Sequence, residues 1–276
     1  MSGKMGYGQD TSQDASFFTW RWLMGLLLMF VMIGVIVMIH ESGHYLMMVR
    51  NGVPVEEFTV GFGPTLFQRQ LKNGTWFRLK LILLGGYAKP ANNGLELEAA
   101  HWWARLKIYA GGMIANCLAA GVALTVLFFH QVSVQGGGPK IYAYALLMAF
   151  VKPFMYWLST PLVLAKLLIF SPKVVASGVQ GPVGIIAAGT VINMSQGLWG
   201  FMAHFVNMFV MINVGLAGFN LVPIPGLDGG RIAMMPFEKL LGKKWSQILT
   251  MAGFLLLLTV MILVTSKDIA GLLSSH

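Results

Sequence analysis

Four long apolar segments recur along the chain and are separated by polar stretches. They cover residues 22–48, 108–130, 198–222 and 247–265. An apolar segment of about 20 residues is long enough to cross the hydrocarbon core of a bilayer as a helix. The pattern therefore predicts an α-helical integral membrane protein with about four transmembrane helices.

A different pattern lies between the first two apolar segments. Residues 66–71 and 75–84 flank the sequence Lys72-Asn73-Gly74. Asn-Gly between two apolar runs is a strong signal for a β-hairpin. We therefore expect a membrane-associated β-hairpin within residues 61–87, after the first helix. The glycines that mark its two ends are Gly61, Gly63, Gly85 and Gly86.

The remaining segments give the predicted domain organisation. Residues 1–19 are polar and rich in Gly, Ser and Gln, which predicts a flexible tail. Residues 141–170 are apolar but contain Lys152 and two prolines. A lysine in mid-membrane is costly, so an amphipathic or re-entrant segment is favoured over an additional span. One domain is expected over residues 20–267, followed by a C-terminal tail at 268–276.

Composition and charge support a membrane protein and suggest its orientation. The chain is 56% hydrophobic and only 11% charged, too few charges to cover a water-soluble globule. Twelve of the 19 Lys and Arg residues lie in two loops, eight in 50–107 and four in 231–244. The positive-inside rule places both loops in the cytoplasm. The excess positive charge is thus explained by the lipid bilayer, and no nucleic-acid partner is expected.

The first apolar segment ends in His40-Glu41-Ser42-Gly43-His44, an HExxH motif. The i, i+4 spacing puts both imidazoles on one helix face, where they can bind one Zn²⁺. Glu41 follows the first ligand, so its carboxylate can reach a metal-bound water and act as general base. The helix from Arg21 to His40 would be about 28 Å long. The metal would then lie inside the membrane, near its cytoplasmic face.

A catalytic zinc ion needs a third protein ligand and one open position. Asp228 is favoured because it ends a long charge-free stretch and lies on the same side of the membrane as the HExxH motif. His130 and His204 are expected at the opposite side, whereas His101 and Glu238 lie on the correct side but in polar loops. The candidates are Asp228, Glu238, His101, His130 and His204.

These motifs together resemble the site-2 protease family, and within it the bacterial RseP-type regulators of sigma-E. The resemblance rests on His40-Glu41-Ser42-Gly43-His44 in a first span and Asn220-x-x-Pro223-x-Pro225-x-x-Asp228-Gly229-Gly230 after a third. Supporting motifs are Gly61-Phe62-Gly63-Pro64, Leu84-Gly85-Gly86-Tyr87, Ala110-Gly111-Gly112 with Asn116, and Gly181-Pro182-Val183-Gly184-Ile185. RseP-type enzymes carry PDZ domains between spans two and three. Here the intervening segment is too short and apolar for one.

The resemblance implies His40, His44 and Asp228 as zinc ligands and Glu41 as base. It also implies cleavage of single-span membrane proteins, of the anti-sigma-factor or remnant-signal-peptide type, in the bacterial inner membrane. An unwound substrate must satisfy its backbone groups in lipid, which an exposed hairpin edge can do by strand addition. The predicted substrate-binding residues are Asn220, Pro223, Pro225, Asn116, Gly61, Gly63, Gly85 and Gly86. For Asn116 an interhelical hydrogen bond explains the residue equally well.

Three functions remain to be weighed. An intramembrane zinc endopeptidase is favoured, because a binding protein needs metal ligands but no base, and Glu41 is intact. The alternative is a non-catalytic zinc-holding scaffold that binds single-span helices. A zinc transporter ranks last, since it would need a series of ligands along a path.

Overall fold

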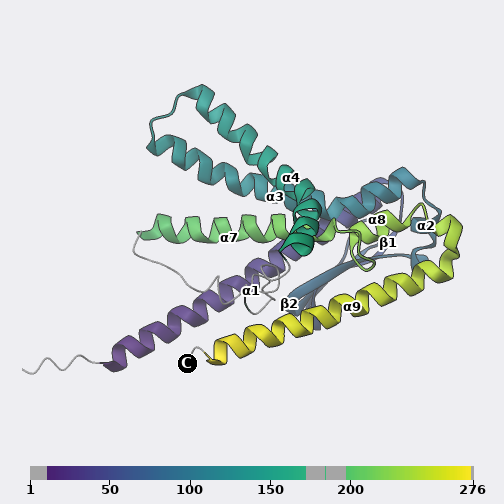
Figure 1. Ribbon diagram of the computed structural model, residues 1–276, viewed down its shortest axis with the longest axis horizontal. Helices are drawn as coiled ribbons and strands as arrows, with labels where there is room; N and C mark the ends of the chain where they lie inside the picture. The colour runs from purple at the N-terminus through teal and green to yellow at the C-terminus, as the bar shows by residue number, and fades with distance from the viewer. Residues whose placement is uncertain (1–10, 172–183, 185–196, 275–276) are drawn as a thin grey trace, which may run out of the picture.

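The computed structural model describes residues 11–171, 184 and 197–274. It is mainly helical, with one small antiparallel sheet after the first helix (Figure 1). The prediction of an α-helical chain with a β-hairpin in this place is confirmed. In chain order the elements are α1 (Thr11–Arg50), β1 (Val55–Gln70), β2 (Trp76–Pro90), the 3-10 helix η1 (Asn92–Gly94), α2 (Leu95–Ala99), α3 (Trp102–Val134), α4 (Pro139–Phe170), α7 (Gly197–Asn220), α8 (Asp228–Met234) and α9 (Glu238–Ser274).

Five helices in the described part of the chain are long and apolar enough to cross a membrane, so the count of four is not confirmed. The additional helix is α4, which contains Pro153 and Pro161 without being interrupted. Lys152 argued against a span here. Its Nζ lies 5.1 Å from the centroid of the Phe128 ring of α3. This cation–π contact offsets part of the cost of placing the charge among apolar helices.

The described parts of both predicted tails are helical. Helix α1 begins at Thr11 and α9 continues to Ser274, so residues 11–19 and 268–274 are helical. Extending an existing helix adds one hydrogen bond per residue without the cost of nucleation, and therefore tolerates polar residues. Residues 1–10 and 275–276 lie outside the described residues, as does most of the motif at 181–185.

Helix α3 is the centre of the helical part. It packs against α1, α4 and α7, and Figure 1 shows α4 and α7 beside it. Met113 and Cys117 of α3 form one buried cluster with Trp157 of α4 and Ala217 of α7. Gly43 of α1 lies against Gly111 of α3, so the C-terminal half of α1 meets the N-terminal half of α3 and the HExxH motif lies beside α3.

Strands β1 and β2 are bent, so different parts of β1 pair with different parts of β2. Residues 55–60 of β1 are registered with 86–90 of β2, and 57–60 also have partners at 76–79. The second half of β1, residues 65–70, pairs with 76–80 across the predicted Lys72-Asn73-Gly74 turn. Gly61 and Gly63, with φ of +89° and +82°, lie where β1 bends between its two halves. In the described chain, residues 86–90 and 65–70 have partners on one side only.

A polar cluster inside the sheet holds these parts together. The carboxylate oxygen Oε1 of Glu57 accepts hydrogen bonds from Thr59 Oγ1 at 2.6 Å, Arg78 Nη1 at 2.7 Å and the Tyr87 hydroxyl at 3.1 Å. Burial raises the pKa of Glu57, but the three donors and the Arg78 charge outweigh it and lower the pKa below its ordinary value. Glu57 therefore stays ionised and ties β1 to both ends of β2.

Candidate metal centre

Three side chains from distant parts of the chain meet at one point. His40 and His44 come from the last three turns of α1, and Asp228 is the first residue of α8. Asp228 Oδ2 lies 3.2 Å from His40 Nε2 and 3.1 Å from His44 Nε2. The two Nε2 atoms are 3.2 Å apart. All three residues are buried. Among the described residues, they form a group of side chains that could hold a metal ion.

The cluster fits a zinc ion in its donor atoms and its dimensions. Bond lengths of about 2.0–2.1 Å and a tetrahedral arrangement separate neighbouring ligand atoms by about 3.3 Å. The three observed separations of 3.1–3.2 Å are close to this value. Two imidazole nitrogens and one carboxylate oxygen leave a fourth position open, as in catalytic zinc sites. The ligand set predicted from the sequence is thus brought together.

The state of each ligand is set by its neighbours. His44 Nδ1 lies 2.7 Å from the Ile108 carbonyl oxygen, which can only accept, so Nδ1 carries the proton and Nε2 presents a lone pair to the cluster. Asp228 Oδ2 lies 3.1–3.2 Å from both Nε2 atoms, so the carboxylate oxygen faces the point at which the imidazole nitrogens converge.

Glycines create the space for the cluster where α1 crosses α3. A Cβ on Gly43 would collide with the carbonyl oxygen of Gly111, so the two helix backbones are nearly in contact. A Cβ on Gly112 would lie 2.5 Å from His44 Nε2 and 2.8 Å from His40 Nε2. Gly112 therefore keeps free the volume in which the metal ligands converge.

A second pair of glycines places Asp228. After α7 ends at Asn220, the chain passes Pro223 and Pro225 and folds back into α8. A Cβ on Gly229 would collide with the carbonyl oxygen of Leu221, and one on Gly230 with that of Ile224. The Asp-Gly-Gly sequence is thus required because α8 lies directly on the backbone of the preceding loop.

Glu41 is part-buried on α1, next to β2 of the sheet. A Cβ on Gly86 would lie 3.3 Å from Glu41 Cγ and 3.3 Å from Val37 Cγ1. No hydrogen bond or ion pair occupies the Glu41 carboxylate within the part of the chain that the structure describes. The carboxylate predicted as base is thus available beside both the metal ligands and the strand.

The other four candidates for the third ligand lie elsewhere. Glu238 pairs with Arg105, with an N–O distance of 2.7 Å. His101 caps α3 by accepting from the Trp103 N–H. His130 and His204 lie toward the far ends of α3 and α7, respectively.

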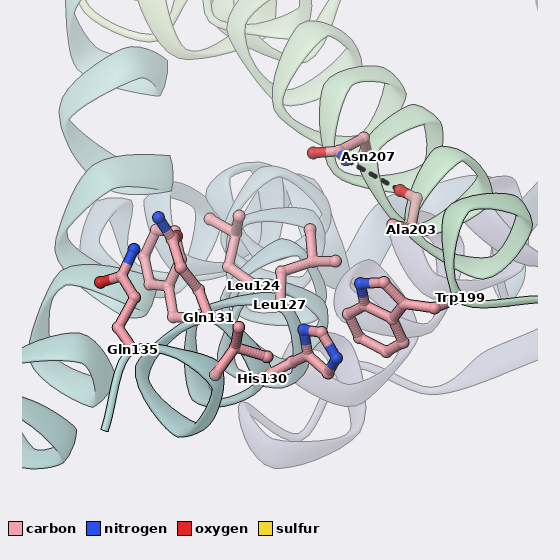
Figure 2. A pocket seen from close by; sticks show the side chains of 10 residues that line it. Leu124, Leu127, His130, Gln131, Gln135, Trp199, Ala203 and Asn207 are labelled. Carbon is pink, nitrogen blue, oxygen red and sulfur yellow. Dashed lines mark hydrogen bonds between the residues drawn. The ribbon is translucent and has the colours of Figure 1, made fainter. Parts of the chain in front are cut away.

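His130 belongs to a separate cavity of about 400 Å³ between α3 and α7, shown in Figure 2. Its imidazole stacks on Trp199, with ring centroids 3.5 Å apart. Since Ile108 contacts His44 and His130 follows 22 residues later on α3, this cavity lies about 33 Å along the helix from the metal centre. This cavity is therefore separate from the metal centre.

The residues predicted to bind substrate lie in three places: at the end of α7 and in the loop after it, on α3, and in the two strands. Asn220 is part-buried and donates to the Leu216 carbonyl at 3.0 Å, and Pro223 is exposed. Pro225 lies against Gly253 of α9. Asn116 is fully buried, with Nδ2 at 3.4 Å from His40 Nδ1. The four glycines lie at the bends of the strands, where Gly61, Gly63, Gly85 and Gly86 adjoin Ile82, Phe62 and Glu41.

Two features of the centre were not identified from the sequence. The acceptor for His44 is a main-chain carbonyl, which leaves no signature in residue type. Gly112 was noted only as a small residue in a motif, although the small residues of the second apolar segment were the available signal for a close helix crossing.

Comparison with known proteins agrees with this geometry. Residues 28–260 match peptidase family M50. A Clostridium acetobutylicum protein named as a zinc metalloprotease is 26% identical over 327 aligned residues, covering 86% of this chain and 94% of the relative. The Yersinia pestis protease RseP is 35% identical over 116 residues, 38% of this chain and 26% of the relative. A zinc metalloprotease of Xylella fastidiosa is 37% identical over 110 residues, 36% of this chain and 25% of the relative.

The match to the family thus extends from the first membrane helix to the last, and it includes all three residues of the metal cluster. Relatives from several bacteria carry names that describe zinc metalloproteases. The chain therefore belongs to peptidase family M50, the site-2 protease family, and is a multi-pass membrane zinc metalloprotease.

Proposed function

We propose that this protein is an intramembrane zinc endopeptidase that cuts transmembrane segments of single-span membrane proteins. The observation that carries the proposal is the position of the metal cluster on α1. His40 lies 17 residues into the candidate span that begins at Leu23, about 26 Å along the helix. The hydrocarbon core is about 30 Å thick. A peptide bond cut at this depth belongs to a membrane-embedded segment.

Glu41 is proposed as the general base. When bound, the zinc ion supplies Lewis acidity that activates a water and polarises the substrate carbonyl. Glu41 is adjacent to His40 and its carboxylate has no other partner in the described chain. It would accept the proton of the water and pass it to the leaving amine.

The membrane orientation follows from charge. The loops that contain β1, β2 and α8 carry twelve of the 19 basic residues and adjoin the metal centre. The positive-inside rule favours the cytoplasm for both loops, so the active site would face the cytoplasmic side of the bacterial inner membrane. Proteins of the anti-sigma-factor or remnant-signal-peptide type are the proposed substrates.

The sheet is proposed to hold the unwound substrate by strand addition. Residues 86–90 pair only with β1 among the described residues, and Gly86 adjoins Glu41. An extended peptide paired with this edge would have its backbone satisfied in lipid, where each unsatisfied group costs several kcal/mol. By contrast, residue 79 has partners on both sides, and residues 65–70 form the other edge of the sheet.

Incubation of the purified protein with a panel of single-span helices tests the proposed function. We expect cleavage within the apolar segment of at least one peptide, measured by product mass. A zinc chelator should abolish it, and added zinc should restore it. Binding of these peptides without any product would support the scaffold alternative instead. Cleavage confined to soluble, unfolded peptides would contradict the intramembrane substrate class.

The edge is tested by proline substitution at Tyr87 and Ala88, one at a time. Neighbouring residues in a strand point their N–H groups to opposite edges, so one of these two faces away from β1. Proline there removes a donor for substrate without breaking the β1 ladder. We expect a strong loss of cleavage in that variant, with zinc content retained.

The matched control is Gln68→Pro, on the edge formed by residues 65–70, which should leave cleavage nearly unchanged. Tyr87→Ala and Ala88→Gly separate the backbone effect from the loss of the side chain. If both prolines at 87 and 88 leave turnover unchanged in folded protein, strand addition at this edge is wrong.

A further inference from the structure

Asn116 differs from the other asparagines in the described α-helices. The side-chain amides of Asn207, Asn213 and Asn220 each donate to the carbonyl oxygen four residues earlier, at 2.8, 2.8 and 3.0 Å. Asn116 instead points across the α1–α3 interface, and its Nδ2 lies 3.4 Å from His40 Nδ1. The residue is 0% exposed. Its side-chain amide therefore faces the imidazole ring of His40, one of the three proposed metal ligands.

With Nδ2 toward His40, the Asn116 amide does not match the tautomer that His40 needs in order to bind zinc. A neutral imidazole has one protonated nitrogen, so His40 can offer a lone pair at Nε2 only when Nδ1 carries the proton. Asn116 Nδ2 is also a donor, so the amide N–H and the His40 Nδ1–H would face each other with no acceptor between them. At the same time Asn116 Oδ1 is buried and has no hydrogen-bond partner in the described structure. Rotating the amide by 180° brings this oxygen to His40 Nδ1.

We propose that Asn116 is a positioning residue whose Oδ1 accepts a hydrogen bond from His40 Nδ1–H. The bond fixes the orientation and tautomer of the ring, so that Nε2 presents its lone pair to zinc. Asn116 then acts through His40 and does not touch the substrate. The inference rests on the zinc cluster alone, and it is independent of the class of substrate.

The other histidine supports the same principle. His44 Nδ1 lies 2.7 Å from the Ile108 carbonyl oxygen, which also belongs to α3. Helix α3 would thus give each imidazole one acceptor, a main-chain oxygen for His44 and a side-chain oxygen for His40. Such outer partners set ring orientation and ligand basicity, and losing one typically weakens metal binding by about 10- to 100-fold.

The test compares Asn116→Leu with Asn116→Asp by zinc affinity, measured in detergent by competition with a chromophoric chelator. Leucine has a similar volume and no acceptor, so we expect affinity to fall by about 10- to 100-fold. Aspartate keeps an oxygen acceptor and should stay within about threefold of the wild type. The absorption spectrum of the Co²⁺-substituted protein should change in the leucine variant and be restored in the aspartate variant.

Asn213→Leu is the matched control. Asn213 is also 0% exposed, with an unpartnered Oδ1 in the described structure, but it donates to Phe209 and lies outside the cluster. It should lower thermal stability without changing zinc affinity. Wild-type affinity in Asn116→Leu would overturn the proposal. An equal loss in both Asn116 variants would overturn it too, because it would show that the amide N–H is the group required.

A measurement on the wild-type protein covers the case in which the Asn116 variants do not fold. Zinc-loaded protein labelled with ¹⁵N-histidine should show His40 protonated at Nδ1 and metal-bound through Nε2. The His40 signals are assigned by their absence in His40→Ala. An unprotonated Nδ1 on His40, or binding through that atom, would overturn the proposal.

Discussion

Glu41→Gln is expected to abolish proteolysis while leaving zinc content near one ion per chain. The amide keeps the size of the carboxylate but cannot accept the proton of the attacking water. Loss of a positioned general base costs about 10²- to 10⁴-fold in rate. Because His40, His44 and Asp228 form the cluster, the metal should remain. Product formation from a single-span helix and elemental analysis of the same sample test both parts.

The control for this substitution is Glu96→Gln, the same chemical change on α2, where Glu96 accepts from Asn92. It should cleave at the wild-type rate. Proteolysis retained in Glu41→Gln would assign the base to another group. Loss of zinc in Glu41→Gln would instead show that Glu41 takes part in metal binding, and the two results can be told apart by the metal content.

The metal cluster could be predicted because two kinds of information agreed. The i, i+4 spacing of His40 and His44 is a local property of any helix. The choice of Asp228, 184 residues beyond His44, depended on topology, since charge placed the ends of the first and third spans on one side. The structure brings Asp228 Oδ2 within 3.2 Å of both imidazoles. The distances therefore bring together the residues that were paired in the prediction. The count of four spans on which the choice of Asp228 rested is not confirmed, because the described chain has five helices long and apolar enough to cross a membrane.

The supports of the cluster could not be predicted in the same way. Which glycine faces the imidazoles depends on the rotation of α3 about its own axis, and Gly111 and Gly112 are neighbours with different roles. Gly111 lies against the backbone of Gly43, whereas Gly112 faces His40 and His44. One residue corresponds to a rotation of about 100° around the helix axis. The extent of an apolar segment in the sequence does not define the rotation of its helix this finely.

The sheet shows a similar limit. The Asn-Gly turn was identified correctly, because turn chemistry is local. The strands were nevertheless longer than the predicted 61–87, starting at Val55 and ending at Pro90. The fold-back of 86–90 onto 55–60 is a long-range pairing that the alternation of apolar and polar residues does not specify. It depends on bends at Gly61 and Gly63, which let one strand take part in two pairings.

Gly112→Ala is expected to remove zinc from a chain that still contains all three ligands. The new Cβ would lie 2.5 Å from His44 Nε2 and 2.8 Å from His40 Nε2, so one or both imidazoles must move away from Asp228. A tetrahedral site tolerates ligand displacements of only a few tenths of an ångström. We expect zinc affinity to fall by at least about 100-fold, more than the decrease typically caused by removing one hydrogen-bond partner of a metal ligand.

Gly215→Ala on α7 is the matched control, because a Cβ there meets nothing within 4 Å. Alanine usually favours helices over glycine by about 1 kcal/mol, so both variants gain intrinsic helix stability and only the crowding at the metal differs. Zinc content near one per chain in folded Gly112→Ala would show that the centre lies elsewhere or is held far more loosely than these distances imply.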